Sequence, residues 1–337
     1  MDKKKKIGII GAGRIGKMHA ENIRANFFND IEIKSVADLF ADKINDWAKS
    51  LGIKNVYKDP ERILEDEEIE AVFICSSTDT HSRLIIDAAM AGKHVFCEKP
   101  IDFDLDRIHH ALDAVEKAGI KLQIGFQRRF DRSFRKACEM IRQGKIGELN
   151  ILRITSRDPQ PPPLDYIKVS GGIFLDMTIH DFDMARFLSG SEVTEVYASG
   201  AVLVDPAIGD VGDVDTAVVT LKFENGAIGV IDNSRRSVYG YDQRVEAFGS
   251  KGCVAVSNDT LTNTVLSDEN GATADKLKYF FIERYKDAYV EEIRAFFDCI
   301  INDKQPPVTG IDGLEPVIIG LAAKKSLMEG RPVKISR

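Results

Sequence analysis

The sequence has 337 residues, which is enough for two domains of ordinary size. Hydrophobic residues make up 44% and charged residues 29% of it, the proportions of a soluble globular protein. The formal net charge of −7, with no basic domain to offset it, argues against nucleic acid as a partner, and no apolar run approaches the roughly 20 residues of a membrane-spanning helix.

The cysteines and the N-terminal segment bear on the compartment and on metal binding. The five cysteines are scattered, none belongs to a C-x-x-C pair, and the histidines do not cluster with them. The basic run at residues 3–6 leads directly into a short apolar strand, without the longer apolar core and cleavage site of a signal peptide. We therefore expect no metal, no membrane segment and a cytoplasmic location.

The first motif follows an apolar run at residues 7–10 that predicts a buried strand. It reads Gly11-Ala12-Gly13-Arg14-Ile15-Gly16, and a helical pattern then continues to residue 26. In such a motif Gly11 allows a tight turn, Gly13 lets the main chain approach a pyrophosphate, and Gly16 lets the helix pack on its strand. The helix N-terminus supplies N–H groups and partial positive charge to phosphates. The strand before and the helix after favour nucleotide binding over a purely structural turn.

A second predicted strand, at residues 31–37, ends in Asp38, which lies 22 residues after Gly16. A carboxylate at this point accepts a hydrogen bond from the ribose 2′-hydroxyl and repels a 2′-phosphate. Leu39 and Phe40 follow, rather than an arginine that could pair with such a phosphate. These residues predict NAD in preference to NADP.

Strand and helix patterns continue to alternate up to residue 125, which predicts a parallel sheet for the first domain, residues 1–125. Ligands of such sheets bind at the carboxyl ends of the strands. The polar residues at these strand ends are Ser76, Ser77, His81, Glu98, Lys99 and Gln127. They are expected to lie near the cofactor. For His81 the alternative is a surface histidine in the first turn of a helix.

Beyond residue 148 predicted strands follow one another without helices between them, and Asn225-Gly226 is a strong hairpin signal. This succession of strands predicts an antiparallel sheet. The predicted fold class is therefore an α/β Rossmann domain followed by an α+β domain with a large, mostly antiparallel open sheet. The second domain is assigned to residues 126–337 and includes helices at 283–302 and 313–328, of which the last is free to pack back on the first domain.

Residues 171–183 are the most informative stretch of the chain. If they form one helix, Asp176 and His180 are four residues apart and Asp183 follows three further on, so all three share a face. A carboxylate one turn from an imidazole orients the ring and stabilises its protonated form, which indicates general acid–base chemistry. The proline-rich connection at 158–172 is interpreted as a substrate-covering loop, with a simple spacer as the alternative.

Glu98-Lys99-Pro100 follows a predicted buried strand. A single lysine is usually a solvated surface charge, but in a cleft beside His180 it would lower the pKa of the histidine and donate to a substrate oxygen. A cis bond before Pro100 would fix the direction of Lys99.

Together these segments resemble the glucose-fructose oxidoreductase and inositol dehydrogenase family of two-domain, nicotinamide-dependent sugar and polyol dehydrogenases. The resemblance covers nearly the whole chain and is closest to the inositol dehydrogenases, notably at residues 168–172 and 239–243. It implies oxidation of myo-inositol to 2-keto-myo-inositol with NAD. It also implies a dimer or tetramer of identical chains.

The resemblance further implies a catalytic set of Lys99, Asp176 and His180. His180 would accept the hydroxyl proton, Asp176 would orient His180, and Lys99 would polarise the reacting oxygen. Arg14, Ile15 and Leu39 join the glycines and strand-end residues as expected cofactor contacts. The residues expected near the polyol, besides the catalytic set, are Arg129, Asp158, Asp183 and Tyr241.

Two alternatives remain open at this point. One is a dehydrogenase of the same family that acts on scyllo-inositol, chiro-inositol or an aldose. The other is a non-catalytic NAD-binding regulator, which is disfavoured because such a protein need not keep Lys99, Asp176 and His180 together.

Overall fold

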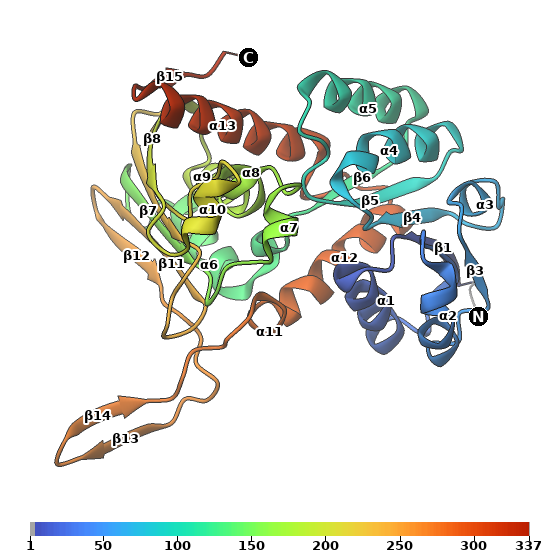
Figure 1. Ribbon diagram of the computed structural model, residues 1–337, viewed down its shortest axis with the longest axis horizontal. Helices are drawn as coiled ribbons and strands as arrows, with labels where there is room; N and C mark the ends of the chain where they lie inside the picture. The colour runs from blue at the N-terminus through green and yellow to red at the C-terminus, as the bar shows by residue number, and fades with distance from the viewer. Residues whose placement is uncertain (1–3, 337) are drawn as a thin grey trace. The chain divides into compact units, whose positions relative to one another are not determined.

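The computed structural model describes residues 4–336 (Figure 1). Lys3, the first residue of the basic run, lies outside that part. The chain divides into two compact units, of which the first holds the residues up to Gln127 together with Tyr289–Glu315. The second unit holds Arg128–Ala288 and the chain from Pro316 onward. In the described part, no helix combines the length and the hydropathy needed to cross a membrane.

The first unit is built on a six-stranded sheet in which every neighbouring pair is parallel. The strand order is β3-β2-β1-β4-β5-β6, which is the order of doubly wound dinucleotide-binding folds. The predicted parallel sheet is confirmed. Its strands are β1 (Lys5–Ile10), β2 (Ile31–Ala37), β3 (Asn55–Tyr57), β4 (Ala71–Ile74), β5 (His94–Glu98) and β6 (Leu122–Gly125).

Helices alternate with these strands, as expected for parallel crossovers. β4 is apolar and fully buried, as is typical of a parallel strand covered on both faces. The helices of this part are α1 (Arg14–Asn26), α2 (Ala41–Ser50), α3 (Glu61–Leu64), α4 (His81–Met90) and α5 (Leu105–Ala118), with a short 3₁₀ turn η1 (Thr78–Thr80) before α4.

A helix from the C-terminal part of the chain completes the first unit. Ile293, Phe296 and Phe297 of α12 (Lys286–Ile301) belong to the same buried cluster as Ile7 and Phe73 of the sheet. From the sequence alone, this helix is expected to belong wholly to the second domain. Its apolar face instead supplies aromatic side chains to the first core, which is why residues 289–315 join the first unit.

The second unit contains a seven-stranded sheet in the order β12-β11-β7-β10-β9-β8-β15. Among the described strands of this sheet only β7 and β10 are parallel neighbours, so the sheet is mixed and mostly antiparallel, as predicted. Gly226, at a φ of 86°, forms the expected tight turn between β9 and β10. The strands are β7 (Leu149–Arg157), β8 (Val193–Ala201), β9 (Thr216–Phe223), β10 (Ile228–Ser234), β11 (Asp242–Gly249), β12 (Gly252–Val256) and β15 (Val333–Lys334).

One face of this sheet is covered by helices, since α9 packs on β7 and α6 packs on β12. Along β9 the other face is exposed at every second residue. A separate ribbon of β13 (Val265–Asp268) and β14 (Gly271–Ala274) extends from this unit (Figure 1). The helices are α6 (Arg132–Arg142), α7 (Leu164–Ile167), α8 (Gly172–Asp176), α9 (Ile179–Ser189), α10 (Pro206–Asp210), α11 (Phe281–Arg284) and α13 (Gly310–Glu329), with a 3₁₀ turn η2 (Gln127–Phe130).

Candidate active site

The glycine-rich turn after β1 has the geometry that the motif predicts. Gly11 has a φ of 93°, and its N–H donates to the carbonyl oxygen of Ala37 over 2.8 Å. A Cβ at Gly11 would lie 2.5 Å from the backbone nitrogen of Ser76, and one at Gly16 would lie 2.0 Å from the carbonyl oxygen of Gly11. Packing of the protein itself therefore requires both glycines.

Gly13 is different, because a Cβ built there meets no described atom within 4 Å. Protein packing does not explain this glycine, whereas close approach of a ligand does. Gly13 is also the N-cap of α1, and its lack of a side chain leaves the first-turn N–H groups without a side-chain cap. The turn thus fits a dinucleotide pyrophosphate, which would lie against the N-terminus of α1 next to Arg14 and Ile15.

Asp38 follows β2 and is held beside the glycine-rich turn. One carboxylate oxygen accepts from the backbone N–H of Ala12 and the other from that of Phe40, each over 2.8 Å. Each oxygen keeps lone-pair capacity for a ribose hydroxyl. The next side chains, Leu39 and Phe40, are 75% and 62% exposed and carry no positive charge for a 2′-phosphate. The arrangement fits NAD.

The predicted strand-end residues of the first unit fall at the ends of β4, β5 and β6. His81 is buried, so its interpretation as a surface histidine is wrong. Its Nδ1 lies 2.8 Å from the carbonyl oxygen of Pro100 and its Nε2 3.0 Å from that of Ser76, and burial lowers its pKa. The Lys99-Pro100 bond is cis. The remaining residues of this set differ in burial, with Ser77 exposed and Gln127 buried.

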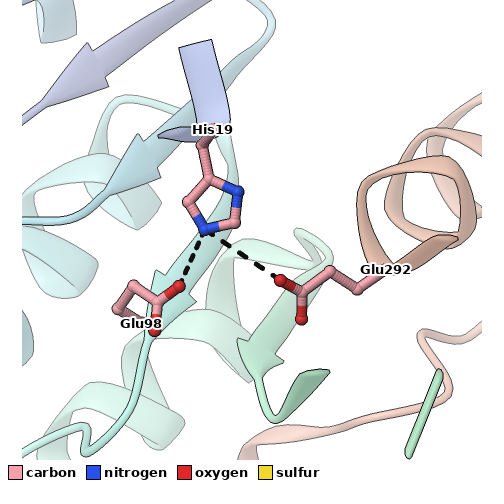
Figure 2. Close-up of side chains that lie close together, drawn as sticks. All are labelled: His19, Glu98 and Glu292. Carbon is pink, nitrogen blue, oxygen red and sulfur yellow. Dashed lines mark hydrogen bonds and ion pairs between the residues drawn. The ribbon is translucent and has the colours of Figure 1, made fainter. Parts of the chain in front are cut away.

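Glu98, at the end of β5, belongs to a cluster with His19 of α1 and Glu292 of α12 (Figure 2). His19 Nε2 lies 2.7 Å from a Glu98 oxygen and 4.0 Å from a Glu292 oxygen. Glu292 is fully buried, and burial, followed by the charge of Glu98, raises its pKa well above the ordinary value. The three donor atoms lie within 4.8 Å of one another.

In the second unit the structure joins two of the residues expected near the polyol. Arg129 of η2 forms a forked ion pair with Asp183 of α9, with Nε 2.9 Å from both carboxylate oxygens and Nη2 2.6 Å from one of them. Asp183 is fully buried, so the charge needs this partner. A charged pair with fixed geometry offers both donors and acceptors to a substrate with many hydroxyl groups.

Asp176 and Asp158 meet through Arg235, a residue that is not predicted from the sequence. Arg235 Nη1 lies 3.0 Å from Asp176 Oδ2 and 3.7 Å from Asp158 Oδ2. The hydroxyl of Tyr166 donates to the other oxygen of Asp176 over 2.9 Å. Burial raises the pKa of Asp158 to about 6, against the opposing effect of Arg235.

Asp176 and His180 do not lie on one continuous helix, so that expectation is corrected. α8 ends at Asp176 and α9 begins at Ile179. At the break, the hydroxyl of Thr178 lies 3.1 Å from the carbonyl oxygen of Ile173 and 2.7 Å from the amide oxygen of Asn233. Asp176 is thus the last residue of α8, and its carboxylate is held by Tyr166 and Arg235.

A buried polar network lies next to these residues. Arg128 donates to Asp181 over 2.6 Å and to Ser156 over 3.2 Å, and Asn233 donates to Asp181 over 2.8 Å. Tyr241 is also buried, and burial raises the pKa of its hydroxyl. Arg128 and Asp181 flank predicted residues in the sequence, but no local signal separates them from surface charges.

The predicted site residues are thus divided between the units. Lys99 and all cofactor residues lie in the first unit, whereas Asp176, His180 and the other polyol residues lie in the second. Within the first unit, the glycine-rich turn, Asp38 and Ser76 come together. Within the second, Arg129 pairs with Asp183, and Arg235 joins Asp158 to Asp176.

Sequence comparison defines the class of protein. A model described as an oxidoreductase family with an NAD-binding Rossmann fold matches residues 5–126, and a GFO/IDH/MocA C-terminal domain model matches residues 134–255. The fold and the nucleotide turn are accordingly those of an NAD-binding oxidoreductase.

Relatives that match over nearly the whole chain narrow the class of oxidoreductase. Myo-inositol 2-dehydrogenase of Thermotoga maritima is 53% identical over 98% of both chains. Inositol 2-dehydrogenase of Rhizobium meliloti is 45% identical over 98% of this chain and 99% of its own length. The crystal structure of scyllo-inositol dehydrogenase from Lactobacillus casei, with bound NAD(H) and scyllo-inositol, has a TM-score of 0.93 at 31% identity and covers 99% of this chain and 100% of that one. The chain belongs to the GFO/IDH/MocA oxidoreductase family, which confirms the predicted family and cofactor.

Proposed function

We propose that this protein oxidises myo-inositol to 2-keto-myo-inositol with NAD as the hydride acceptor. The observation that carries this proposal is the 53% identity, over 98% of both chains, to a myo-inositol 2-dehydrogenase. The site of the second unit supports it, because a neutral cyclic polyol must be recognised through many directional hydrogen bonds. Asp158, Asp183, Arg129 and Tyr241 supply such groups.

In the proposed mechanism the reacting hydroxyl loses its proton to His180 while the hydride leaves the same carbon and the C=O bond forms. NAD, when bound, supplies the acceptor for that hydride. Asp176 orients the imidazole and stabilises its protonated form. Lys99 donates to the reacting oxygen, and its positive charge stabilises the developing alkoxide.

The proposed cofactor contacts follow the features of the first unit. The α1 N-terminus binds the pyrophosphate, Asp38 accepts from the ribose hydroxyls, and Leu39 lies beside the adenosine half. The proposed contacts, gathered in one place, are Gly11, Gly13, Arg14, Ile15, Gly16, Asp38, Leu39, Ser76, Ser77, His81, Glu98, Lys99 and Gln127.

A second candidate within the same class is a scyllo-inositol dehydrogenase. It is favoured by the 36% identity to a scyllo-inositol 2-dehydrogenase of Bacillus subtilis over 99% of this chain. A spectrophotometric screen of NAD and NADP reduction with myo-, scyllo- and chiro-inositol and with glucose tests both proposals. Turnover that is fastest with scyllo-inositol would support the second candidate, and no turnover with any inositol would exclude both.

We also propose that identical chains associate through the uncovered face of the seven-stranded sheet. Large apolar side chains are exposed there on five neighbouring strands, which is unusual for a monomer. They are Ile151, Tyr197, Val218, Ile228 and Phe248. Light scattering of the purified protein tests this, with a dimer or tetramer expected and a monomer contradicting it.

The five cysteines, all free, support a reducing cytoplasmic location.

A further inference from the structure

Arg235 lies at the carboxyl end of the parallel strand pair β7 and β10 of the second sheet. It directly follows β10, whose last residue, Ser234, is in register with Arg157 at the end of β7. The residue after β7 is Asp158, and its N–H donates to the carbonyl oxygen of Ser234 over 2.9 Å. The backbone therefore places Arg235 beside Asp158. The backbone N–H of Arg235 also donates to the carbonyl oxygen of Asp215 over 2.8 Å, which anchors its main chain.

The guanidinium and the Tyr166 hydroxyl hold Asp176 through different oxygens. Arg235 Nη1 donates to Oδ2 over 3.0 Å, and Tyr166 donates to Oδ1 over 2.9 Å. Two donors on separate oxygens fix the plane of a carboxylate, which one donor cannot do. Asp176 is the last residue of α8, so these two contacts hold its carboxylate at the point where the helix ends.

The surroundings of Arg235 are not those expected of a purely structural ion pair. Its side chain is 2% exposed, and neither Nε nor Nη2 has an acceptor among the described atoms. A buried guanidinium with two unsatisfied donors is costly, and such groups are concentrated at functional sites. The carboxylates that face it are Asp158, Asp176 and Asp213, so removing it would take away the cation that pairs with Asp158 and Asp176.

We propose that Arg235 is a positioning residue for the dehydrogenase reaction, acting by holding the Asp176 carboxylate in its reactive orientation. This inference rests on the proposed role of Asp176 as the partner of His180. Arg235 itself exchanges no proton and no hydride. Its contribution is to fix the carboxylate that orients the proton acceptor, so its loss lowers kcat and leaves NAD binding intact.

The first test compares R235M with R157M. Methionine keeps an unbranched apolar stem and removes the charge at both positions. Arg157 is a matched control, because it ends the neighbouring strand and is held by Asp232 and Tyr239 instead of Asp176. R235M is expected to lower kcat about 100-fold while changing KM for NAD less than about twofold, and R157M is expected to retain kcat. Wild-type kcat in folded R235M would overturn the inference.

A double variant separates positioning from a general structural role. If Arg235 acts through Asp176, adding R235M to D176N lowers kcat no further. The kcat of the double variant then equals that of D176N alone. Losses that multiply would overturn the inference. If R235M does not fold, R235K decides the question, because it keeps the charge but cannot reproduce the planar fork. R235K is then expected to lose about tenfold in kcat, and unchanged kcat would count against positioning.

The same measurements distinguish this inference from the function on which it rests. Wild-type protein that fails to oxidise any inositol, or a fully active D176N, would contradict the proposed function. An inactive D176N together with a fully active R235M would contradict only the role of Arg235. Added guanidinium ion should partly restore the kcat of R235A and leave the kcat of D176N unchanged. This result would favour a role of Arg235 in positioning Asp176.

Discussion

Replacing Glu292 with Gln should change how the stability of the first unit depends on pH. Glu292 is fully buried, with one carboxyl oxygen 4.0 Å from His19 Nε2 (Figure 2), and burial, followed by the charge of Glu98, raises its pKa well above its ordinary value. Neither of its carboxyl oxygens has a hydrogen-bond partner among the described atoms. Gln has nearly the same volume and stays neutral at all pH values, so E292Q keeps the packing and removes the titration.

The sign follows from proton linkage. In the unfolded chain Glu292 titrates at about 4.3. Above that pH the folded state still holds the proton and the unfolded state has lost it. The free energy of unfolding therefore falls by about 1.4 kcal/mol for each pH unit until the pH reaches the raised, folded-state pKa. E292Q lacks this slope. Between about pH 5 and pH 7 its stability relative to wild type should rise by up to roughly 3 kcal/mol.

The only tryptophan of the chain, Trp47, packs against the core cluster of the first unit and reports its unfolding. Urea unfolding followed by Trp47 fluorescence at several pH values gives the slopes directly. E291Q is the matched control, since Glu291 is the preceding residue on α12 and pairs with Arg294 at an exposed position. Its slope should equal that of wild type. Parallel pH dependences for E292Q and wild type would refute the reasoning about the buried carboxyl.

Three further changes test the site and the core. H180A should lower turnover by about 10³-fold while NAD still binds in a fluorescence titration, because only proton transfer is lost; unchanged turnover would reject the proton-acceptor role. D38A should weaken NAD binding and raise kcat/KM with NADP relative to NAD, and an unaltered ratio would count against the ribose contact. F296A removes a fully buried ring from the core of the first unit and should lower the free energy of unfolding by about 3–5 kcal/mol in urea titrations. A loss below about 1 kcal/mol would mean that the core repacks into the space left by the ring.

The parts of the fold that depend on local chemistry could be predicted from the sequence. The glycine-rich turn needs positive φ at Gly11 and no side chain at Gly16, and both requirements are visible as residue types. The same holds for Asn225-Gly226, because a tight hairpin turn selects these residues. Asp38 could be identified because its distance from the turn along the chain is nearly fixed by one helix and one strand.

The parts that depend on long-range contacts could not be predicted. α12 joins the first core although it lies about 160 residues beyond the last strand of that sheet, and helical periodicity does not name the partner of an apolar face. At the break between α8 and α9, the Thr178 hydroxyl contacts Asn233, which lies far along the chain from it. Arg235 became identifiable only once β7 and β10 were found to be parallel neighbours, because only then do Asp158 and Arg235 end adjacent strands.

The central claim is that one carbon of the polyol gives its hydride to NAD while the protein takes the hydroxyl proton. Myo-inositol labelled with deuterium at C2 tests this most directly, with mass spectrometry of both products. The account predicts deuterium in the nicotinamide ring of the reduced cofactor and an unlabelled 2-keto product. Unreduced NAD, or deuterium recovered in water instead of the cofactor, would contradict it.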